Sequence, residues 1–267
     1  MFDAAPPPPI AEQVQTVAQA PSWDLTAGLV AATVQIDQPI AGTEQRTVGT
    51  GFLVSAPGPG GAPRVVLVTA AHVFNNFPDA DARIGWRFER PDGDWRFAPE
   101  PLRIRNDQGQ PLWTQHPQRD VAAMVITAPP EFARAAIPLA WLADEQTVKA
   151  LEVSAADEVA TLGFPRGLSS NRVGFPILRV GRVASAPLTP FSAFPTFLID
   201  MRVFPGNSGG PVFWASPLRR RPDAPQSPYP IVLGLLAREV QVGEERLDLG
   251  VVAPASQIRE VIAQLPQ

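Results

Sequence analysis

Short apolar stretches separated by turn-forming residues dominate the chain from about residue 29 onward. The stretches are rich in Val, Ile, Leu, Phe and Thr, and clusters of Gly and Pro bound them. Many short strands with turns between them are typical of a β-barrel or a β-sandwich. The pattern therefore predicts an all-β protein, with strands at residues 29–36, 48–55, 65–69, 121–127, 158–163, 178–185, 196–201, 211–214, 231–240 and 247–252.

Turns and one helix are also indicated. Residues 57–63 and 91–94 place Pro and Gly between strand-like runs and predict hairpin turns. Apolar residues at helical spacing predict a helix over residues 255–265 that packs its apolar face against the barrel. These apolar residues are Ile258, Val261, Ile262 and Leu265.

Two proline-rich segments are expected to lie outside the core. Residues 6–9 are four consecutive prolines and predict a stiff polyproline segment. Residues 217–230 combine several prolines with three consecutive arginines and predict a long exposed loop. A basic run of this kind is more often a solvated surface than a binding site. The same loop is nevertheless the feature that most favours a protein partner.

Composition excludes several classes of protein. The chain has 267 residues, enough for one large β unit or two small domains, and no cysteine, which excludes disulfides and thiolate metal sites. It has only two histidines, so a histidine-rich zinc site is not expected, and no cofactor or metal is predicted. The net charge of -4 gives no reason to expect nucleic acid as a partner.

No run approaches the roughly 18 apolar residues of a membrane span, so no membrane span is expected. The first 20 residues lack the basic start and the apolar block of a signal peptide. Two interpretations remain open: the protein is cytoplasmic, or the sequence begins after a removed leader.

Three segments carry residue types that nucleophilic catalysis requires. His72 follows an apolar strand, Asp120 opens another, and Ser208 lies in a glycine-rich turn before a third. Each has an ordinary interpretation by itself, as a polar residue at a strand end or in a tight loop. Together, in this order and with these flanks, they predict a catalytic triad. The other histidine, His116, precedes a proline in a polar stretch and is expected in a surface loop.

These segments resemble the triad motifs of chymotrypsin-like (trypsin-like) serine proteases, especially the disulfide-free bacterial branch that includes HtrA-type and glutamyl endopeptidases. Residues 69–72 match the family's Thr-Ala-Ala-His, residues 120–122 match its Asp-hydrophobic-Ala, and residues 206–211 match its Gly-Asn-Ser-Gly-Gly-Pro. The resemblance extends more faintly from about residue 48 to the C-terminal helix. It implies a serine endopeptidase acting on polypeptides, and it favours a periplasmic or secreted location.

The resemblance also implies the fold, two six-stranded antiparallel β-barrels with a C-terminal α-helix. Residues 1–22 would be a proline-rich N-terminal segment. Residues 23–140 would form the first barrel, which carries His72 and Asp120. Residues 141–267 would form the second barrel, which carries Ser208, together with the helix. The active site would then lie between the barrels.

The roles of the site residues follow from the same resemblance. His72 would act as the general base and acid, Asp120 would orient it, and Ser208 would form the acyl-enzyme. The amides of Gly206 and Ser208, with Asn207 between them, would form the oxyanion hole. Asn207 replaces the aspartate that pairs with a new N-terminus in many trypsins, so no such activation step is expected.

The specificity pocket implied by the resemblance departs from the animal enzymes. Carbon-rich side chains on its wall would favour small or medium apolar residues at the cleaved position, because no Asp or Glu stands where basic residues are selected. The alternative is a preference for acidic residues, created by an arginine. The expected pocket residues are Arg202, Val203, Leu236, Ala237 and Arg238.

Two other functions remain open for the same fold. The first is a hydrolase that acts mainly on small esters or on one dedicated peptide. The second is a non-catalytic binding or scaffold protein. The intact set of three triad residues favours an enzyme over a scaffold.

Overall fold

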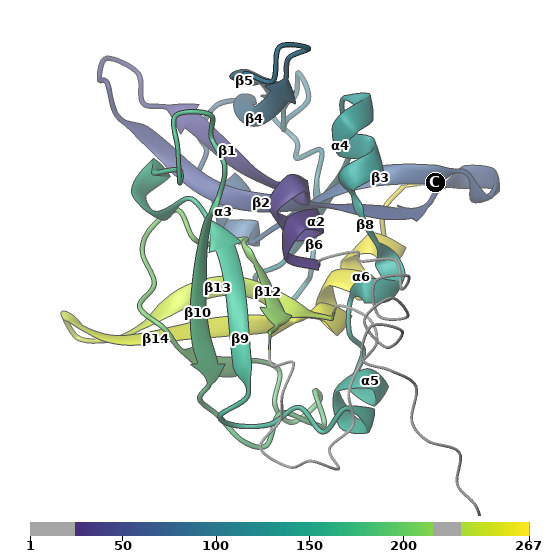
Figure 1. Ribbon diagram of the computed structural model, residues 1–267, viewed down its shortest axis with the longest axis vertical. Helices are drawn as coiled ribbons and strands as arrows, with labels where there is room; N and C mark the ends of the chain where they lie inside the picture. The colour runs from purple at the N-terminus through teal and green to yellow at the C-terminus, as the bar shows by residue number, and fades with distance from the viewer. Residues whose placement is uncertain (1–24, 216–230, 267) are drawn as a thin grey trace, which may run out of the picture.

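The computed structural model describes residues 25–215 and 231–266, which form two β-sheets with short helices beside them (Figure 1). The predicted proline-rich segment at residues 1–22 and the whole of the predicted loop at residues 217–230 lie outside the described residues. Within the described ranges, no helix is long and apolar enough to cross a bilayer.

The first sheet has eight strands, in the order β5-β4-β1-β2-β3-β7-β6, with β8 parallel to β2. Its hydrogen-bonded ladder does not close on itself, so the predicted six-stranded barrel is wrong in both strand number and closure. The chain between β5 and β6 is irregular, and Leu112 N donates to Ile104 O at 2.9 Å there. The strands are β1 (Thr33–Pro39), β2 (Arg46–Pro57), β3 (Pro63–Thr69), β4 (Asp81–Glu89), β5 (Trp95–Arg103), β6 (Thr114–Gln115), β7 (Ala122–Ile126) and β8 (Ile137–Pro138).

The second sheet is a closed barrel of six antiparallel strands, in the order β10-β11-β14-β13-β12-β9. The six-stranded antiparallel barrel predicted for this half is confirmed. Its core is made of buried apolar side chains that include Val159, Ile199, Val212 and Val252. The strands are β9 (Glu158–Gly163), β10 (Ile177–Val183), β11 (Phe197–Asp200), β12 (Pro211–Trp214), β13 (Val232–Val242) and β14 (Glu245–Pro254).

Five α-helices are found among the described residues: α2 (Leu25–Ala32), α3 (Ala71–Asn75), α4 (Pro130–Ala135), α5 (Glu145–Ala150) and α6 (Ala255–Ala263). The strand predicted at residues 29–36 is wrong in its first half, because α2 continues to Ala32. This run is apolar on all sides, so its period does not distinguish a buried helix from a strand. Thr33 begins β1, and its Oγ1 donates to Leu29 O at 2.6 Å.

The hairpin of β4 and β5 surrounds the turn predicted at residues 91–94, which is confirmed. Arg90 N donates to Asp94 O at 2.7 Å, and Gly93 has a φ of +80°. The two strands were not predicted, because Pro99, Pro101 and several charged residues interrupt the β-forming pattern. Pairing along the whole hairpin overrides these local preferences.

Helix α6 joins the second half of the chain to the first. Its predicted apolar face is confirmed as buried, through Ile258, Val261, Ile262 and Leu265. These side chains belong to the core cluster that lies mainly in the first sheet, and the helix contacts β6 and β7 as well as β13 and β14. The two sheets therefore share this core cluster, while the interior of the closed barrel forms a separate one. The predicted division at residues 140 and 141 stays a prediction; the first sheet ends at Pro138 and the second begins at Glu158.

The substitution Ile258→Ala tests this shared core. Ile258 is fully buried, so the truncation removes apolar contacts and leaves a cavity. We expect the free energy of unfolding to fall by about 2 to 5 kcal/mol, measured by urea denaturation. The exposed residue Gln264 supplies the control, and Gln264→Ala should change stability by less than about 0.5 kcal/mol. Equal stability of the two variants would contradict the packing of α6 described above.

Candidate active site

His72 lies on α3, the five-residue helix that follows β3. The residues at the end of β3 are buried, and Thr69 Oγ1 donates to Thr50 O on β2 at 2.7 Å. These contacts fix the end of β3 and thereby the start of α3. The His72 side chain is 38% exposed.

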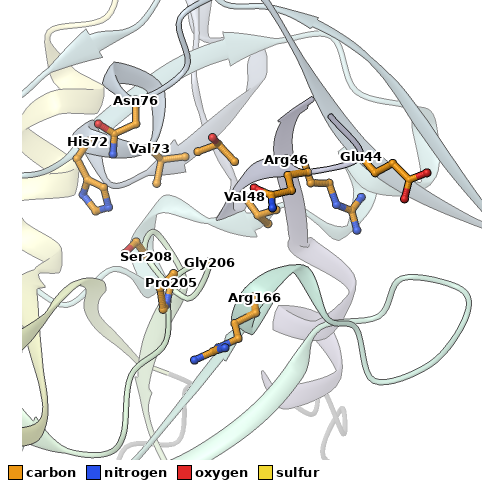
Figure 2. Close-up of a pocket in the computed structure, with 12 residues that line it drawn as sticks. Glu44, Arg46, Val48, His72, Val73, Asn76, Arg166, Pro205, Gly206 and Ser208 are labelled. Atoms are coloured by element: carbon orange, nitrogen blue, oxygen red, sulfur yellow. The ribbon is translucent and has the colours of Figure 1, made fainter. Parts of the chain in front are cut away.

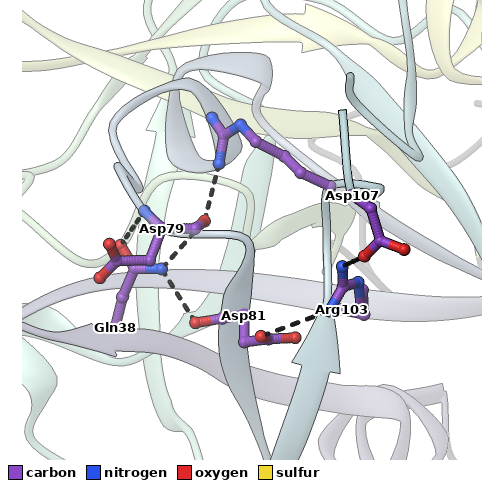
Figure 3. A network of polar contacts seen from close by, with 6 residues as sticks. Gln38, Asp79, Asp81, Arg103 and Asp107 are labelled. Carbon is purple, nitrogen blue, oxygen red and sulfur yellow. Dashed lines mark hydrogen bonds and ion pairs between the residues drawn. The ribbon is translucent and has the colours of Figure 1, made fainter. Parts of the chain in front are cut away.

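The segment after α3 is held by polar side chains from the neighbouring strands (Figure 3). The Gln38 side chain donates to Asp81 O at 2.9 Å and to Asp79 O at 3.3 Å, and it accepts from Asp79 N at 3.2 Å. Arg105 Nη1 donates to Phe77 O at 2.7 Å. These bonds fasten the exit of α3, so the helix that carries His72 is held at both ends.

His72 and Asp120 form a two-point hydrogen-bonded pair. The Asp120 carboxylate accepts from His72 N at 2.9 Å through Oδ1, and Oδ2 lies 2.7 Å from His72 Nδ1. An ionised carboxylate can only accept hydrogen bonds, so Nδ1 is the donor and carries a proton. In neutral His72 the other ring nitrogen, Nε2, therefore has a free lone pair.

The pKa of Asp120 is lowered from its ordinary value. Burial by itself raises this pKa. The opposing effects are larger in sum: hydrogen bonds from the His72 ring and from the backbone N–H groups of His72 and Ala71, together with the charge of protonated His72. The carboxylate consequently stays ionised at neutral pH.

Ser208 lies in a turn that requires glycine at two positions. Gly206 has a φ of +94° and Gly209 a φ of +88°. A β-carbon at Gly206 would lie 2.3 Å from Phe164 O, and one at Gly209 would lie 2.0 Å from Thr50 O. Only glycine fits both the backbone conformation and the available space, which explains the glycine-rich motif around the serine.

The peptide between Pro205 and Gly206 is oriented by the loop after β9. Arg166 N donates to Pro205 O at 2.6 Å. In a trans peptide the C=O and the following N–H point in opposite directions, so the Gly206 N–H points away from Arg166. Among the residues that the structure describes, the N–H groups of Gly206 and Ser208 donate to no protein acceptor.

Asn207 takes a different position from its two neighbours. Its backbone N–H donates to Phe204 O at 3.0 Å, so this N–H is already used inside the turn. Its side chain is buried, and Oδ1 has no hydrogen-bond partner within the described part of the chain. The free amides of the turn are therefore those of Gly206 and Ser208, while Asn207 acts as the spacer between them.

Thr50 on β2 joins the turn around Ser208 to the first sheet. Its Oγ1 donates to Gly206 O at 2.6 Å and accepts from Phe164 N at 3.1 Å, and Thr50 N donates to Ser208 O at 2.9 Å. Thr50 is fully buried. Thr50 was not among the predicted site residues, and nothing in the sequence distinguishes it from the other hydroxyl residues of β2, Thr47 and Ser55.

A cavity of about 780 Å³ brings His72, Gly206 and Ser208 together (Figure 2). Arg46 and Arg166 also line it, and both are labelled in Figure 2. The remaining lining residues are Glu44, Gln45, Thr47, Val48, Val73, Asn76 and Pro205. The cavity thus combines a histidine, a serine and free backbone amides with two guanidinium groups.

The residues predicted for the specificity pocket do not line this cavity. Val203 and Leu236 are buried in the core of the second barrel, and Ala237 is buried as well. Arg202 and Arg238 are exposed, and Arg202 Nε lies 3.4 Å from Asp248 Oδ1. The assignment of these five residues to a pocket stays a prediction.

His116 does not lie in an exposed position, as its polar surroundings in the sequence suggested. Its side chain is only 11% exposed, and Nε2 lies 3.0 Å from Glu260 Oε2 on α6. Gln118 N donates to its Nδ1 at 3.1 Å. Pairing with the C-terminal helix buries this histidine, and it does not line the cavity beside Ser208.

The closed barrel, the open first β-sheet and the cavity that His72 and Ser208 both line are those of a chymotrypsin-like protein. A family model described as the trypsin-like peptidase domain matches residues 49–216, more than half of the chain, and the protein belongs to this family. The matched range includes His72, Asp120 and Ser208. A solved structure, the Rv3671c protease in an inactive form, matches with a TM-score of 0.49 and 19% identity over 100% of both chains. No curated protein matches.

The substitution Thr50→Val tests the junction between the turn around Ser208 and the first sheet. It keeps the side-chain shape but leaves Gly206 O and Phe164 N without their buried partner. We expect the free energy of unfolding to fall by about 1 to 3 kcal/mol in urea denaturation. Thr50→Ser keeps the hydroxyl and should lose clearly less. An equal loss in both variants would show that packing of the methyl group, and not the hydrogen bonds, matters here.

Proposed function

We propose that this protein is a serine endopeptidase that hydrolyses peptide bonds through an acyl-enzyme on Ser208. The observation that carries the proposal is the two-point bond between Asp120 and His72, together with the cavity that His72 and Ser208 both line. Membership of the trypsin-like peptidase family supports the reaction class.

In the proposed reaction, Ser208 Oγ attacks the carbonyl carbon of the scissile bond while His72 Nε2 takes its proton. A serine hydroxyl is a weak nucleophile at neutral pH and needs such a base. Asp120 keeps the proton on Nδ1 and stabilises the imidazolium that forms. His72 then donates this proton to the leaving amine. In the second half of the reaction, a water molecule attacks the acyl carbon while His72 takes its proton. His72 then returns the proton to Ser208 Oγ, and the acyl group leaves as a carboxylic acid.

The free amides of Gly206 and Ser208 support the role proposed for them as the oxyanion hole. A negative charge develops on the carbonyl oxygen when Ser208 attacks, and preorganised N–H donors stabilise it. Each donor of this kind typically lowers the barrier by about 3 kcal/mol. The bond from Arg166 N to Pro205 O favours the required orientation of the Gly206 N–H before any substrate binds.

Simple assays distinguish two alternative functions from the proposed one. A scaffold protein that has lost activity would not react with a fluorophosphonate probe, whereas either kind of hydrolase would. A hydrolase of small esters or of one dedicated peptide would react with the probe but would leave casein intact. The loop at residues 217–230, which most favours a partner-binding role, lies entirely outside the described residues.

The substitution Ser208→Ala should abolish fluorophosphonate labelling and lower kcat for peptide hydrolysis by at least about a thousandfold. The fold should remain intact, because only one hydroxyl oxygen is removed. The matched control is Ser154→Ala, at an exposed serine before β9, which should retain full labelling and turnover. Unchanged turnover in Ser208→Ala would refute the assignment of the nucleophile.

The activity should rise with pH and then level off. His72 must be neutral to accept the proton of Ser208, so kcat/KM should fall when acidification protonates its ring. Asp120 adds no step near neutral pH, because its lowered pKa keeps it ionised. Asp120→Asn should lower kcat by about 10⁴-fold. A pH–rate profile measures both effects, and an activity maximum near pH 4 would point to a different mechanism.

The same carboxylate should make stability depend on pH at the acid end. Its pKa is lower in the folded protein, so its stabilising effect is fully present above the ordinary value of about 3.9. The effect is lost as the pH falls through the lower, folded-state pKa. When the pH is lowered from 6 to 2, the melting temperature of Asp120→Asn should fall by less than that of the parent protein.

A further inference from the structure

The proposed reaction places the part of a substrate that follows the scissile bond beside the cavity at Ser208. In the proposed reaction His72 donates a proton to the leaving amine, so this amine lies next to His72. The amine belongs to the first residue after the cleaved bond. His72 lines the same cavity as Arg46 and Arg166, so that residue and the next ones enter a space that two arginines border.

Arg166 approaches the cavity from the loop after β9. It is a non-glycine residue in the left-handed region, with a φ of +53°, and its backbone N–H is bonded to Pro205 O. Its guanidinium lies over the Phe204 ring, 5.7 Å from the ring centre. No carboxylate among the described residues pairs with Arg166, and its side chain is exposed. The group is therefore available to a ligand.

Two more arginines surround the same ring. The guanidinium carbons of Arg179 and Arg202 lie 5.3 Å and 5.2 Å from the centre of Phe204. Of these, Arg202 is paired with Asp248 at 3.4 Å. Three guanidinium groups around one aromatic ring repel one another, and an anion bound nearby would reduce this repulsion.

Arg46 reaches the same wall of the cavity from β2. A β-carbon at Gly167 would lie 3.6 Å from Arg46 Nη2, so this guanidinium adjoins the loop that carries Arg166. Arg46 Nη1 lies 3.2 Å from Asp37 Oδ2, but Asp37 Oδ1 also pairs with Arg83 at 2.6 Å. One buried carboxylate therefore faces two guanidinium groups, and a net positive charge remains.

The charge around the cavity is opposite in sign to that of the whole protein. One acid, Glu44, and two arginines, Arg46 and Arg166, line the cavity. Two guanidinium groups against one carboxylate leave a local excess of positive charge, although the chain carries a net charge of -4. This local excess attracts anionic groups selectively.

We propose that the protein prefers polypeptide substrates with Asp or Glu at the first or second position after the scissile bond, held by Arg166 and Arg46. The inference rests on the proposed endopeptidase function. A guanidinium group binds a carboxylate through two parallel hydrogen bonds, which an ammonium group cannot reproduce. Both arginines are partly solvated, so we expect a gain of about three- to tenfold in kcat/KM over the matching amide.

The test uses fluorogenic peptides that are identical before the scissile bond and carry Glu or Gln at the first or second position after it. The quantity measured is the ratio of kcat/KM for Glu to kcat/KM for Gln. This ratio should be about three to ten in the parent protein, should fall toward one in Arg166→Gln or Arg46→Gln, and should shrink in high salt. Arg166→Lys should restore only part of it.

A matched control removes one positive charge elsewhere. Arg134 on α4 is exposed and lines none of the cavities described, so Arg134→Gln should leave the ratio unchanged. A general loss of net charge would instead lower the ratio in all three variants, and this would overturn the proposal. A fall in both rates with an unchanged ratio in Arg166→Gln would also overturn it, because Arg166 would then act only by positioning Pro205.

A binding measurement separates failure of this inference from failure of the proposed function. Dye-labelled Glu and Gln peptides are titrated with Ser208→Ala protein, and fluorescence anisotropy gives their affinities without hydrolysis. Tighter binding of the Glu peptide that is lost in Ser208→Ala/Arg166→Gln supports the inference even if the parent protein shows no turnover. Equal affinities overturn it, even if casein is digested. Circular dichroism spectra confirm that each variant is folded.

Discussion

The contact between Thr50 and the turn around Ser208 is the interaction on which the whole site depends. Ser208 belongs to the second half of the chain, and His72 to the first. One buried hydroxyl and one backbone N–H on β2 bind the turn at Gly206 and Ser208. Thr69 then ties the end of β3, just before α3, to the same residue. A single position on one strand thereby ties the segments that carry His72 and Ser208 to each other.

Much of this arrangement could be predicted from the sequence, because its chemistry is local. The strand before His72, the glycines around Ser208 and the apolar face of α6 are all carried by neighbouring residues. The open ladder of the first sheet could not be predicted, since it depends on how β5 and β6 meet across the irregular segment between them. Thr50 and Arg166 were missed because their partners, Gly206 and Pro205, lie far away in the sequence.

The loop that carries Arg166 has two connected roles in the proposed site. Its backbone orients the Gly206 amide, and its side chain borders the space that the leaving peptide would occupy. The left-handed conformation of Arg166 is unfavourable for a residue with a side chain. Such conformations persist only where the surroundings hold them, and here the bond to Pro205 does so. The proposed substrate preference and the geometry of the turn around Ser208 are thereby linked through one residue.

The unclosed ladder of the first sheet leaves β5 at its edge, since among the described residues β5 pairs only with β4. Exposed edges of this kind invite pairing with another chain and lead to aggregation. Pro99 and Pro101 lack the N–H that a new partner strand would need, and Arg96, Glu100 and Arg103 add charge along the same strand. The residues that obscured β5 in the sequence are therefore ones that disfavour the pairing of a second molecule with this edge.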